Sequence, residues 1–425
     1  MITLLIVADD FTGALDTGVQ LAGCGAPTRV VTDPEFSPAN AAGAEVLVID
    51  AETRHLPPSQ AGAIVEGIVR RAVEQKVPYI YKKTDSALRG NVGAELGALL
   101  AASGEKALPF LPAYPQIGRC TRGGVHYIEG RPVAESVFGI DPFEPVRHSD
   151  IAGLIGAQSG VPVHSLPADA PAPEGQGIYV YDASSLADLE QAGQTLAAAG
   201  RLHISAGCAG FGAVLPRLLG LGRAQQPPKP RLDPRLLVVC GSVNPITVAQ
   251  LDAAEEAGFA RLRLTPRQKL EPGYWNTPEG EADRARIEAL LQANPRVLLD
   301  SNDAGGNGPT ADYAAGLGCG LEEMRVRIAS SIGDLVAGLL HSPAVGTLLM
   351  TGGDTLLQVM RCAGVRELEP LCELEKGVVL ARCTYRGCTR HVITKSGGFG
   401  QAALLTDLAA RLEAQAEENR NRSER

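Results

Sequence analysis

Short apolar runs alternate with longer amphipathic segments along the first half of the chain. The runs have the length and apolar content of strands buried on both faces, and the longer segments repeat apolar residues at helical spacing. This alternation predicts βαβ units around a mostly parallel sheet. The expected strands are 4–8, 28–31, 46–50, 79–83, 107–111, 178–182 and 203–205, and the expected helices are 13–22, 59–74, 92–102, 185–199 and 211–219.

A proline-rich stretch at 225–234 interrupts this pattern, and a second βα alternation begins directly after it. Proline can continue neither a helix nor a central strand, so the stretch is the best linker in the chain. We expect an N-terminal domain at 1–224, a C-terminal domain at 235–415 and a frayed, charged tail at 416–425. The second set of expected strands is 236–240, 261–264, 297–300, 347–350 and 391–394, and the second set of helices is 245–257, 283–292, 328–340, 356–363 and 401–414.

One segment of the first half has a different pattern. His126 to Ile128 and Arg131 to Val133 read as two short strands around Glu129-Gly130, which predicts a β-hairpin. The whole chain is therefore expected to be an α/β protein of two domains, each a mostly parallel sheet flanked by helices. The N-terminal domain carries the hairpin as an insertion.

Composition narrows the classes of function. The 425 residues exceed what one core usually holds, and 45% hydrophobic and 20% charged residues are ordinary for a globular protein. A net charge of −9 argues against general nucleic-acid binding, although local lysines can still bind an anion. No apolar stretch is long enough for a bilayer and no signal-peptide pattern opens the chain, so we expect no membrane partner. The oligomeric state is not readable.

The nine cysteines are scattered, without a CxxC spacing or a second pair that would complete a zinc site. We therefore expect no protein-held metal, and reduced, mostly buried thiols in a cytoplasmic protein. His126, His148, His203 and His391 stand alone, which is more typical of packing or turn residues than of catalysts. Arg119 follows a proline-bounded loop, where a role in a cleft and a role at the surface are equally open.

Charged side chains crowd the point where the strand at 79–83 gives way to the helix at 92–102. Lys82, Lys83, Asp85, Ser86 and Arg89 all fall there. Open α/β sheets bind ligands at such strand ends, and a helix N-terminus attracts anions. The ligand is expected to be small, hydroxylated and negatively charged, with Arg89 gripping a carboxylate through two hydrogen bonds. Because successive residues of a strand face opposite ways, at most one of the two lysines reaches the ligand.

The first strand ends in Asp9-Asp10, followed by Gly13 at the expected helix start. Two carboxylates there suit the binding of ligand hydroxyls, whereas the ordinary alternative is that one of them caps the helix. The first strand and the strand at 79–83 can be neighbours in such a sheet, which would place both loops at one edge.

The second half carries glycines and hydroxyls at strand ends instead. Three turns share this character, and glycines there let backbone amides approach phosphate oxygens. Three such turns in one domain favour a nucleotide or another polyphosphate. Neither GxxxxGK[ST] nor GxGxxG is present, so the spacing does not identify the nucleotide. The turns are Gly241-Ser242, Thr351 to Thr355 and Thr394 to Gly400.

As an ordered set, these motifs resemble the four-carbon acid sugar kinase family. The resemblance spans nearly the whole chain and implies ATP-dependent phosphorylation of D-erythronate, D-threonate or a 3-oxo form, with Mg²⁺ accompanying ATP. It also implies a sugar-acid domain followed by a nucleotide domain. The matching segments are Ala8 to Ala14, Lys82 to Gly90, Pro112 to Pro115 with Gly118 and Arg119, Gly241 with Ser242, Gly352 to Thr355, and Lys395 to Gly400.

Carried over by position, the resemblance implies two groups of site residues. The group implied to face the sugar acid is Asp9, Asp10, Lys82, Asp85, Ser86 and Arg89, and the group implied to hold ATP is Ser242, Gly352, Gly353, Asp354, Thr355, Gly397 and Gly398. The chain departs from the family pattern at Ala87, at Val243-Asn244 and at 375–379. The last departure bears on the detail of the nucleotide pocket and on substrate identity.

The mechanism we expect is in-line phosphoryl transfer, which needs positioning and charge neutralisation more than covalent help. Asp10 or Asp85 would accept the proton of the attacking hydroxyl, and closure of the domains would exclude water. Two alternatives remain at this point. One is a non-catalytic sensor of sugar acids, which has no need of the glycine turns. The other is a phosphoryl-handling hydrolase, against which the absence of a DxD spacing counts.

Overall fold

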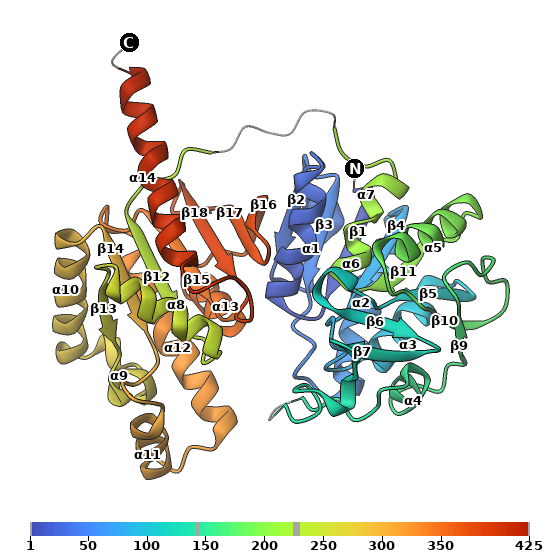
Figure 1. Cartoon of the computed structure of the whole chain (residues 1–425), viewed down its shortest axis with the longest axis horizontal. Helices are drawn as coiled ribbons and strands as arrows, with labels where there is room; N and C mark the ends of the chain where they lie inside the picture. Colours follow the sequence, from blue (N-terminus) through green and yellow to red (C-terminus); the bar gives the residue numbers. More distant parts are fainter. Residues whose placement is uncertain (1, 142–143, 224–229, 424–425) are drawn as a thin grey trace. The chain divides into compact units, whose positions relative to one another are not determined.

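The chain divides into two compact units, Met1–Pro227 and Pro228–Arg425, in the computed structural model (Figure 1). The structure describes residues 2–141, 144–223 and 230–423. The first half of the predicted linker, 225–229, and the end of the predicted tail, 424–425, lie outside the described residues. Each unit holds a mainly parallel sheet with helices on both faces, so the predicted α/β fold class is confirmed.

The N-terminal sheet is parallel throughout its described ladder, in the order β2-β3-β1-β4-β11-β5-β10-β9. Its central strands are apolar and buried along their length because helices cover both faces. The strands are β1 (Leu4–Ala8), β2 (Thr28–Val31), β3 (Val46–Asp50), β4 (Tyr79–Lys83), β5 (Ala107–Leu111), β9 (Val163–Leu166), β10 (Gly177–Tyr181) and β11 (Ile204–Gly207).

Two groups of helices cover this sheet. α2 packs on α3 and α3 on α4, and their apolar faces form a core with the strands. α1 packs on α6, and α7 contacts both α6 and α5. The helices are α1 (Phe11–Gly23), α2 (Pro58–Glu74), α3 (Val92–Ser103), α4 (Ile151–Gly156), α5 (Leu186–Ala198), α6 (Ala209–Gly212) and α7 (Leu215–Leu218).

The order of the strands places a topological switch point between β1 and β4. The chain leaves β1 toward β2 on one side and leaves β4 toward β5 on the other, so the two connections diverge. Such a divergence opens a crevice at the carboxyl ends of the strands, where open α/β sheets bind ligands. β1 and β4 are direct partners, with Ala8 opposite Lys83, as the sequence predicted.

The predicted hairpin is present and has a third strand. β6 (Arg119–Arg122), β7 (Val125–Ile128) and β8 (Arg131–Pro132) form a separate antiparallel sheet. Glu129 and Gly130 both have positive φ, 50° and 82°, as a two-residue turn with the right twist for a hairpin requires.

In the C-terminal unit, five parallel strands and two antiparallel ones follow the order β13-β14-β12-β15-β18-β17-β16. The sequence did not predict β16 and β17, because charged exposed residues and two register shifts hide the alternation in β16. The strands are β12 (Leu236–Cys240), β13 (Ala260–Arg263), β14 (Arg296–Asp300), β15 (Thr347–Thr351), β16 (Glu367–Glu375), β17 (Val378–Tyr385) and β18 (Cys388–Lys395).

The helices of the C-terminal unit also form two groups. α8 and α14 lie side by side and share a core with the strands (Figure 1), whereas α12 packs on α13, α9 and α10. The connections from β12 and β15 diverge, so a second switch point lies between these strands. The helices are α8 (Pro245–Glu256), α9 (Pro266–Leu270), α10 (Pro278–Ala293), α11 (Gly308–Gly316), α12 (Leu321–Leu339), α13 (Gly353–Cys362) and α14 (Leu404–Ser423).

Several predicted helix boundaries were wrong. α10 begins at Pro278 and α12 at Leu321, ahead of the expected starts at 283 and 328. The expected helix at 211–219 is broken into α6 and α7, and Pro216 fits the first turn of α7 because it has no N–H to donate there. The expected end of the last helix at 414 is also wrong, since α14 continues to Ser423. Its final residues are rich in Glu, Gln and Arg, which favour helix even when exposed.

Candidate functional site

Asp9 and Asp10 follow β1 and meet the ammonium of Lys83 from β4. The Nζ of Lys83 lies 3.2 Å from the Oδ1 of Asp9 and 3.0 Å from the Oδ1 of Asp10. Asp10 is also the N-cap of α1, because its Oδ1 accepts a hydrogen bond from the Gly13 N–H. Asp10 therefore caps the helix and also pairs with Lys83 in the charged cluster. A Cβ at Gly13 would overlap the Lys83 ammonium, so the glycine makes this approach possible.

Arg54 joins this cluster, although the sequence analysis did not select it. Its Nη2 lies 2.7 Å from the Oδ2 of Asp9, 2.6 Å from the Oδ1 of Asp10 and 3.8 Å from the Oδ1 of Asp85. Gly90, at φ 82°, leaves the space: a Cβ there would lie 2.9 Å from the Cγ of Arg54. Arg54 follows β3, which ends at the same sheet edge as β1, and that position was the signal available in the sequence.

The two lysines at the end of β4 point to opposite faces of the sheet. Lys82 is fully buried and its Nζ lies 2.9 Å from the Oε2 of Glu95 on α3. Lys83, not Lys82, contacts the aspartates. The structure thus places Lys82, the lysine the sequence analysis assigned to the substrate, in a buried ion pair inside the domain.

The loop from Thr84 to Asn91 carries the remaining predicted residues. Arg89 holds Asp85 with two hydrogen bonds of 3.0 Å, and its Nη1 lies 3.5 Å from Asp141. Leu88 is held at φ 63°, a conformation that non-glycine residues adopt only when their surroundings enforce it. Arg89 is therefore already paired, which qualifies the expectation that it grips a ligand carboxylate by itself.

The inserted hairpin clamps this loop at Ser86. Arg119, the first residue of β6, donates a hydrogen bond to the Ser86 hydroxyl, and the Nε2 of His126 lies 3.0 Å from the Ser86 carbonyl oxygen. Since a carbonyl can only accept, His126 carries its proton on Nε2, and its Nδ1 accepts from the Thr121 hydroxyl. Burial lowers the pKa of His126 to about 4, so the ring is neutral near pH 7.

Two carboxylates of the cluster, Asp10 and Asp85, have lowered pKa values. Burial raises the pKa of Asp10, but Arg54 and Lys83 outweigh this effect and hold the pKa below its ordinary value. Burial likewise opposes ionisation of Asp85, and Arg89 and Arg54 hold its pKa well below the ordinary range. A carboxylate held this way can accept a hydrogen bond from a ligand hydroxyl at any physiological pH.

In the C-terminal unit, the turns after β12, β15 and β18 touch one another. A Cβ at Gly241 would overlap the Thr355 hydroxyl, and a Cβ at Gly397 would lie 3.0 Å from the Oγ of Ser242. Gly352 has φ 104° and lies against Gly241. Asp354 is paired with Arg325 of α12. All seven predicted nucleotide residues thus lie in or beside these turns, at the switch point between β12 and β15, although the Asp354 side chain is already paired.

Residues that the sequence analysis did not assign hold these turns in place. Lys395 donates to the Thr247 hydroxyl at 3.1 Å and to the carbonyls of Ser396 and Gly397. Burial lowers the pKa of Lys395 to about 8. Asn302, after β14, donates to the Ser242 carbonyl at 3.1 Å. Only the register of the parallel strands brings these residues together.

The turns fit a phosphate-bearing ligand on two observations. Gly352, Gly353 and Gly397 are partly exposed and Gly398 is exposed, so a phosphate can approach the backbone at these positions. Within the part of the chain that the structure describes, the buried hydroxyls of Thr351 and Thr394 have no hydrogen-bond partner, and both lie at this edge of the sheet. Unpartnered buried polar groups are costly, and a polar ligand or water would satisfy them.

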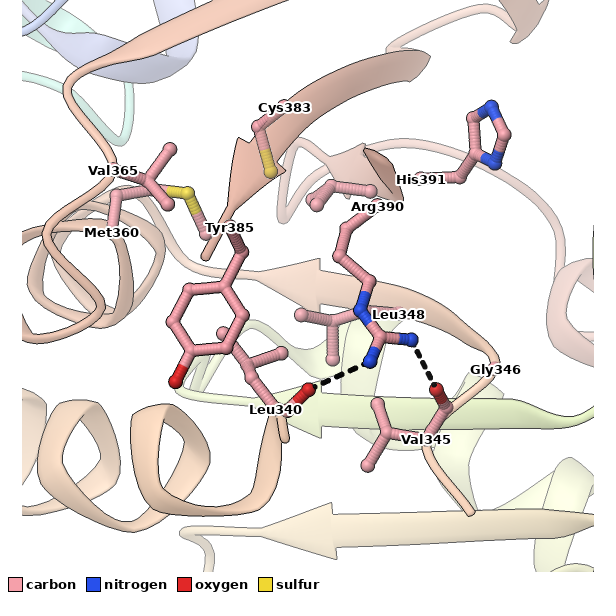
Figure 2. Close-up of a pocket in the computed structure, with 11 residues that line it drawn as sticks. Leu340, Val345, Gly346, Leu348, Met360, Val365, Cys383, Tyr385, Arg390 and His391 are labelled. Carbon is pink, nitrogen blue, oxygen red and sulfur yellow. Dashed lines mark hydrogen bonds between the residues drawn. The ribbon is translucent and has the colours of Figure 1, made fainter. Parts of the chain in front are cut away.

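A cavity elsewhere in the C-terminal unit is not a ligand site. It lies at the amino ends of β15 and β18, the edge opposite the glycine turns, and holds about 10 Å³, room for at most one water. Figure 2 shows Arg390 reaching across it to the carbonyl oxygens of Leu340 and Val345, which end and follow α12. Arg390 therefore acts as a structural cap of that helix.

Comparison with known proteins gives each unit a counterpart. Residues 4–215 match a family model described as a sugar-binding N-terminal domain, and residues 237–405 match one described as a nucleotide-binding C-terminal domain. A D-threonate kinase of Salmonella typhimurium is 30% identical over 95% of this chain and 97% of its own length. A D-threonate kinase of Bordetella bronchiseptica is 31% identical over 94% and 95%. The chain belongs to the four-carbon acid sugar kinase family.

The family resemblance predicted from the sequence is thus confirmed, and the relatives' names favour a kinase over a sensor or a hydrolase. A more distant member, a D-erythronate kinase of Heliobacterium modesticaldum, is 27% identical over 95% of both chains. A crystal structure from Salmonella typhimurium LT2 covers 97% of this chain with a TM-score of 0.78 at 22% identity, a likeness that shows the shared fold.

Two further observations bear on the predicted environment of this family member. None of the nine cysteines forms a disulfide bond within the described residues, and three of them are buried, so the expectation that most are buried was wrong. Within the described residues, no helix has the length and apolar character needed to cross a membrane.

Proposed function

We propose that this chain transfers the terminal phosphoryl group of ATP to a hydroxyl group of a four-carbon sugar acid. One observation carries the proposal: a single chain holds a cluster of carboxylates and cations at the switch point of its sugar-binding domain, and glycine turns at the switch point of its nucleotide-binding domain. D-threonate is the first substrate to test, because the relatives at 30% and 31% identity bear that name. D-erythronate and 3-oxo-tetronate follow from more distant relatives.

In the sugar domain, Asp9, Asp10, Asp85, Ser86 and Arg89 would contact the acid. Lys83 takes the place we first assigned to Lys82, because Lys83 lies among the aspartates and Lys82 is buried against Glu95. Asp10 or Asp85 would accept the proton of the attacking hydroxyl. Their low pKa values make them weak bases, which suits a loose transition state in which the proton leaves late.

In the nucleotide domain, the residues around Ser242, Gly352, Gly353, Thr355 and the Gly397-Gly398 turn would hold ATP. Their amides and the N-terminus of α13 would stabilise the charge of the transferring group. Asp354 would keep its place beside Arg325 at the start of that helix. Mg²⁺ would arrive with ATP, since it is usually held through phosphate oxygens and water rather than by a protein cage.

Phosphoryl transfer requires the acid and ATP to meet away from water. We therefore propose closure of the two domains about the segment near residue 230, and a cytoplasmic location where ATP is supplied. Both remain predictions for experiment.

An ADP-release assay with MgATP and a panel of four-carbon acids tests the proposed function. A kinase releases ADP only when its acid is present, and mass spectrometry then finds a phosphorylated acid. Binding of an acid without ADP release would favour a sensor. Phosphate release from a phosphorylated acid in the absence of ATP would favour a hydrolase.

A further inference from the structure

Arg119 differs from the other cations of the sugar-domain cluster. Arg54, Lys83 and Arg89 each pair with an aspartate. Within residues 2–141 and the rest of the described chain, no carboxylate lies within ion-pair distance of Arg119. Its hydrogen bond goes to the neutral Ser86 hydroxyl. Burial lowers its pKa, which is the expected effect of desolvating a cation without a close counter-ion.

Arg119 and Arg89 also share one aromatic ring. The guanidinium carbon of Arg119 lies 5.1 Å from the centroid of Phe138, and that of Arg89 lies 5.3 Å from the same centroid. Two like charges near one ring repel each other, and the cation–π attraction of the ring offsets only part of this repulsion. An anion bound between the two guanidiniums would offset the remaining repulsion.

We propose that Arg119, with Arg89 and Phe138, forms the subsite for the carboxylate of the sugar acid, and that Arg119 selects acids over neutral polyols. The inference rests on the proposed function and deepens it by naming the side chain that binds the carboxylate of the substrate. Arg89 contributes through its Nη1 edge, because its Nε and Nη2 are held by Asp85 at 3.0 Å and Nη1 has only the longer contact of 3.5 Å with Asp141. Arg119 is then the principal anchor.

The inserted hairpin is what supplies this anchor. Arg119 opens β6, and His126 of β7 fixes the same loop from the Ser86 carbonyl. The hairpin thus positions a guanidinium beside a loop whose own charges are already paired. Without the inserted hairpin, the described residues of the cluster would still include groups that can bind ligand hydroxyls. They would not include a guanidinium outside an aspartate ion pair that could bind a carboxylate through two hydrogen bonds.

The test compares Arg119→Gln with Arg122→Gln. Arg122 lies on the same strand, is exposed and donates to the Ser184 hydroxyl, so the two variants share the change and the element but not the site. With D-threonate, D-erythronate and 3-oxo-tetronate as probes, we expect Arg119→Gln to raise KM for the accepted acid about 10- to 100-fold, since a charged hydrogen bond is lost. kcat and KM for ATP should change little, because the contact exists in the ground state as well.

A neutral polyol tests whether Arg119 recognises the negative charge of the acid. The preference of the enzyme for the acid over threitol or erythritol should fall by the same factor in Arg119→Gln and stay unchanged in Arg122→Gln. Arg119→Lys keeps the charge without the fork and should give an intermediate KM. Added guanidinium ion should restore part of the activity of Arg119→Ala, which a purely structural defect would not allow.

Calorimetry separates failure of this inference from failure of the proposed function. If the protein binds an acid without phosphorylating it, and Arg119→Gln abolishes that binding, the inference stands and the kinase proposal fails. If the protein phosphorylates an acid and Arg119→Gln keeps its KM and its preference over the polyol, the kinase stands and the inference is overturned. Wild-type protein that neither binds nor phosphorylates the acids contradicts both.

Discussion

At the scale of single residues, two adjacent lysines with the same charge serve different structures. Lys82 stabilises the interior through Glu95, and Lys83 holds Asp9 and Asp10 at the ligand edge. The register of β4 makes this division, because neighbouring residues of a strand face opposite ways. A charged motif read from the sequence therefore overstates the number of groups that can reach a ligand.

Matched variants test this division. Lys82→Met leaves the buried Glu95 without its partner and should lower the free energy of unfolding by about 3 kcal/mol, with KM for the acid unchanged. Lys83→Met leaves Asp9 and Asp10 paired with Arg54, so it should cost less stability than Lys82→Met and should lose kcat/KM for the acid. Urea unfolding and steady-state kinetics of the two proteins give both readouts. If Lys82→Met raised KM for the acid while the stability stayed the same, our placement of Lys82 would be wrong.

The proposed base is a second residue-scale prediction. Asp10→Asn keeps an N-capping side chain at α1, and Asp85→Asn keeps an acceptor in the loop, so both variants should fold. The one that removes the base should lower kcat about 10²- to 10⁴-fold with the accepted acid. Stopped-time ADP assays measure this. If both variants turn over near the wild-type rate, neither aspartate is the base.

At the scale of elements, the hairpin of β6, β7 and β8 matters because it fixes the loop that carries Asp85 and Arg89. In this hairpin His126 donates to the Ser86 carbonyl through Nε2, and its Nδ1 accepts from the Thr121 hydroxyl only while the ring is neutral. The folded protein resists protonation of this ring down to about pH 4, whereas the unfolded chain takes up the proton near pH 6.5. The unfolded state thus binds more protons in this range, so stability is lost as the pH falls from 6.5 toward 4.

Replacement of His126 tests this linkage. Wild-type protein should lose up to about 3 kcal/mol of unfolding free energy across that window through this residue, given 1.36 kcal/mol per pKa unit. His126→Gln should be less stable at pH 7 but should show a flatter dependence on pH. The exposed His148→Gln is the control and should follow the wild type. Equal slopes in the wild type and His126→Gln would show that the ring does not titrate as described.

At the scale of the whole molecule, the two units carry separate sites and one of them has a spectroscopic label. The single tryptophan of the sequence is Trp275, buried in the C-terminal unit with its indole N–H 2.8 Å from the Ser331 Oγ. Its fluorescence therefore follows unfolding of the nucleotide domain, while circular dichroism follows both units.

Ligand-linked unfolding uses this label. MgATP at 100 times its dissociation constant should stabilise the Trp275 transition by about 2.7 kcal/mol. The sugar acid alone should stabilise the part of the circular dichroism signal that the Trp275 transition does not follow. An acid that stabilised the Trp275 transition more than MgATP does would contradict the assignment of the two sites.

The sequence by itself determined the α/β class and most strands within one or two residues, and it located the strand ends that carry the candidate sites. Those features are local: apolar runs, proline, and glycine turns report on the backbone close to them. The motif set also identified the family. The sequence did not predict the two antiparallel strands β16 and β17, because their exposed faces and register shifts break the alternation of apolar and polar residues.

Only the tertiary structure decided which side chains share a site. Arg54 lies 45 residues from Asp9 along the chain and 2.7 Å from it in space. Lys395 and Thr247 are likewise brought together by strand register. Choosing Lys83 over Lys82 and finding Arg119 without a counter-ion required knowing which face and which neighbours each side chain has. Local sequence carries no record of these, because contacts between distant segments arise only when the sheet assembles.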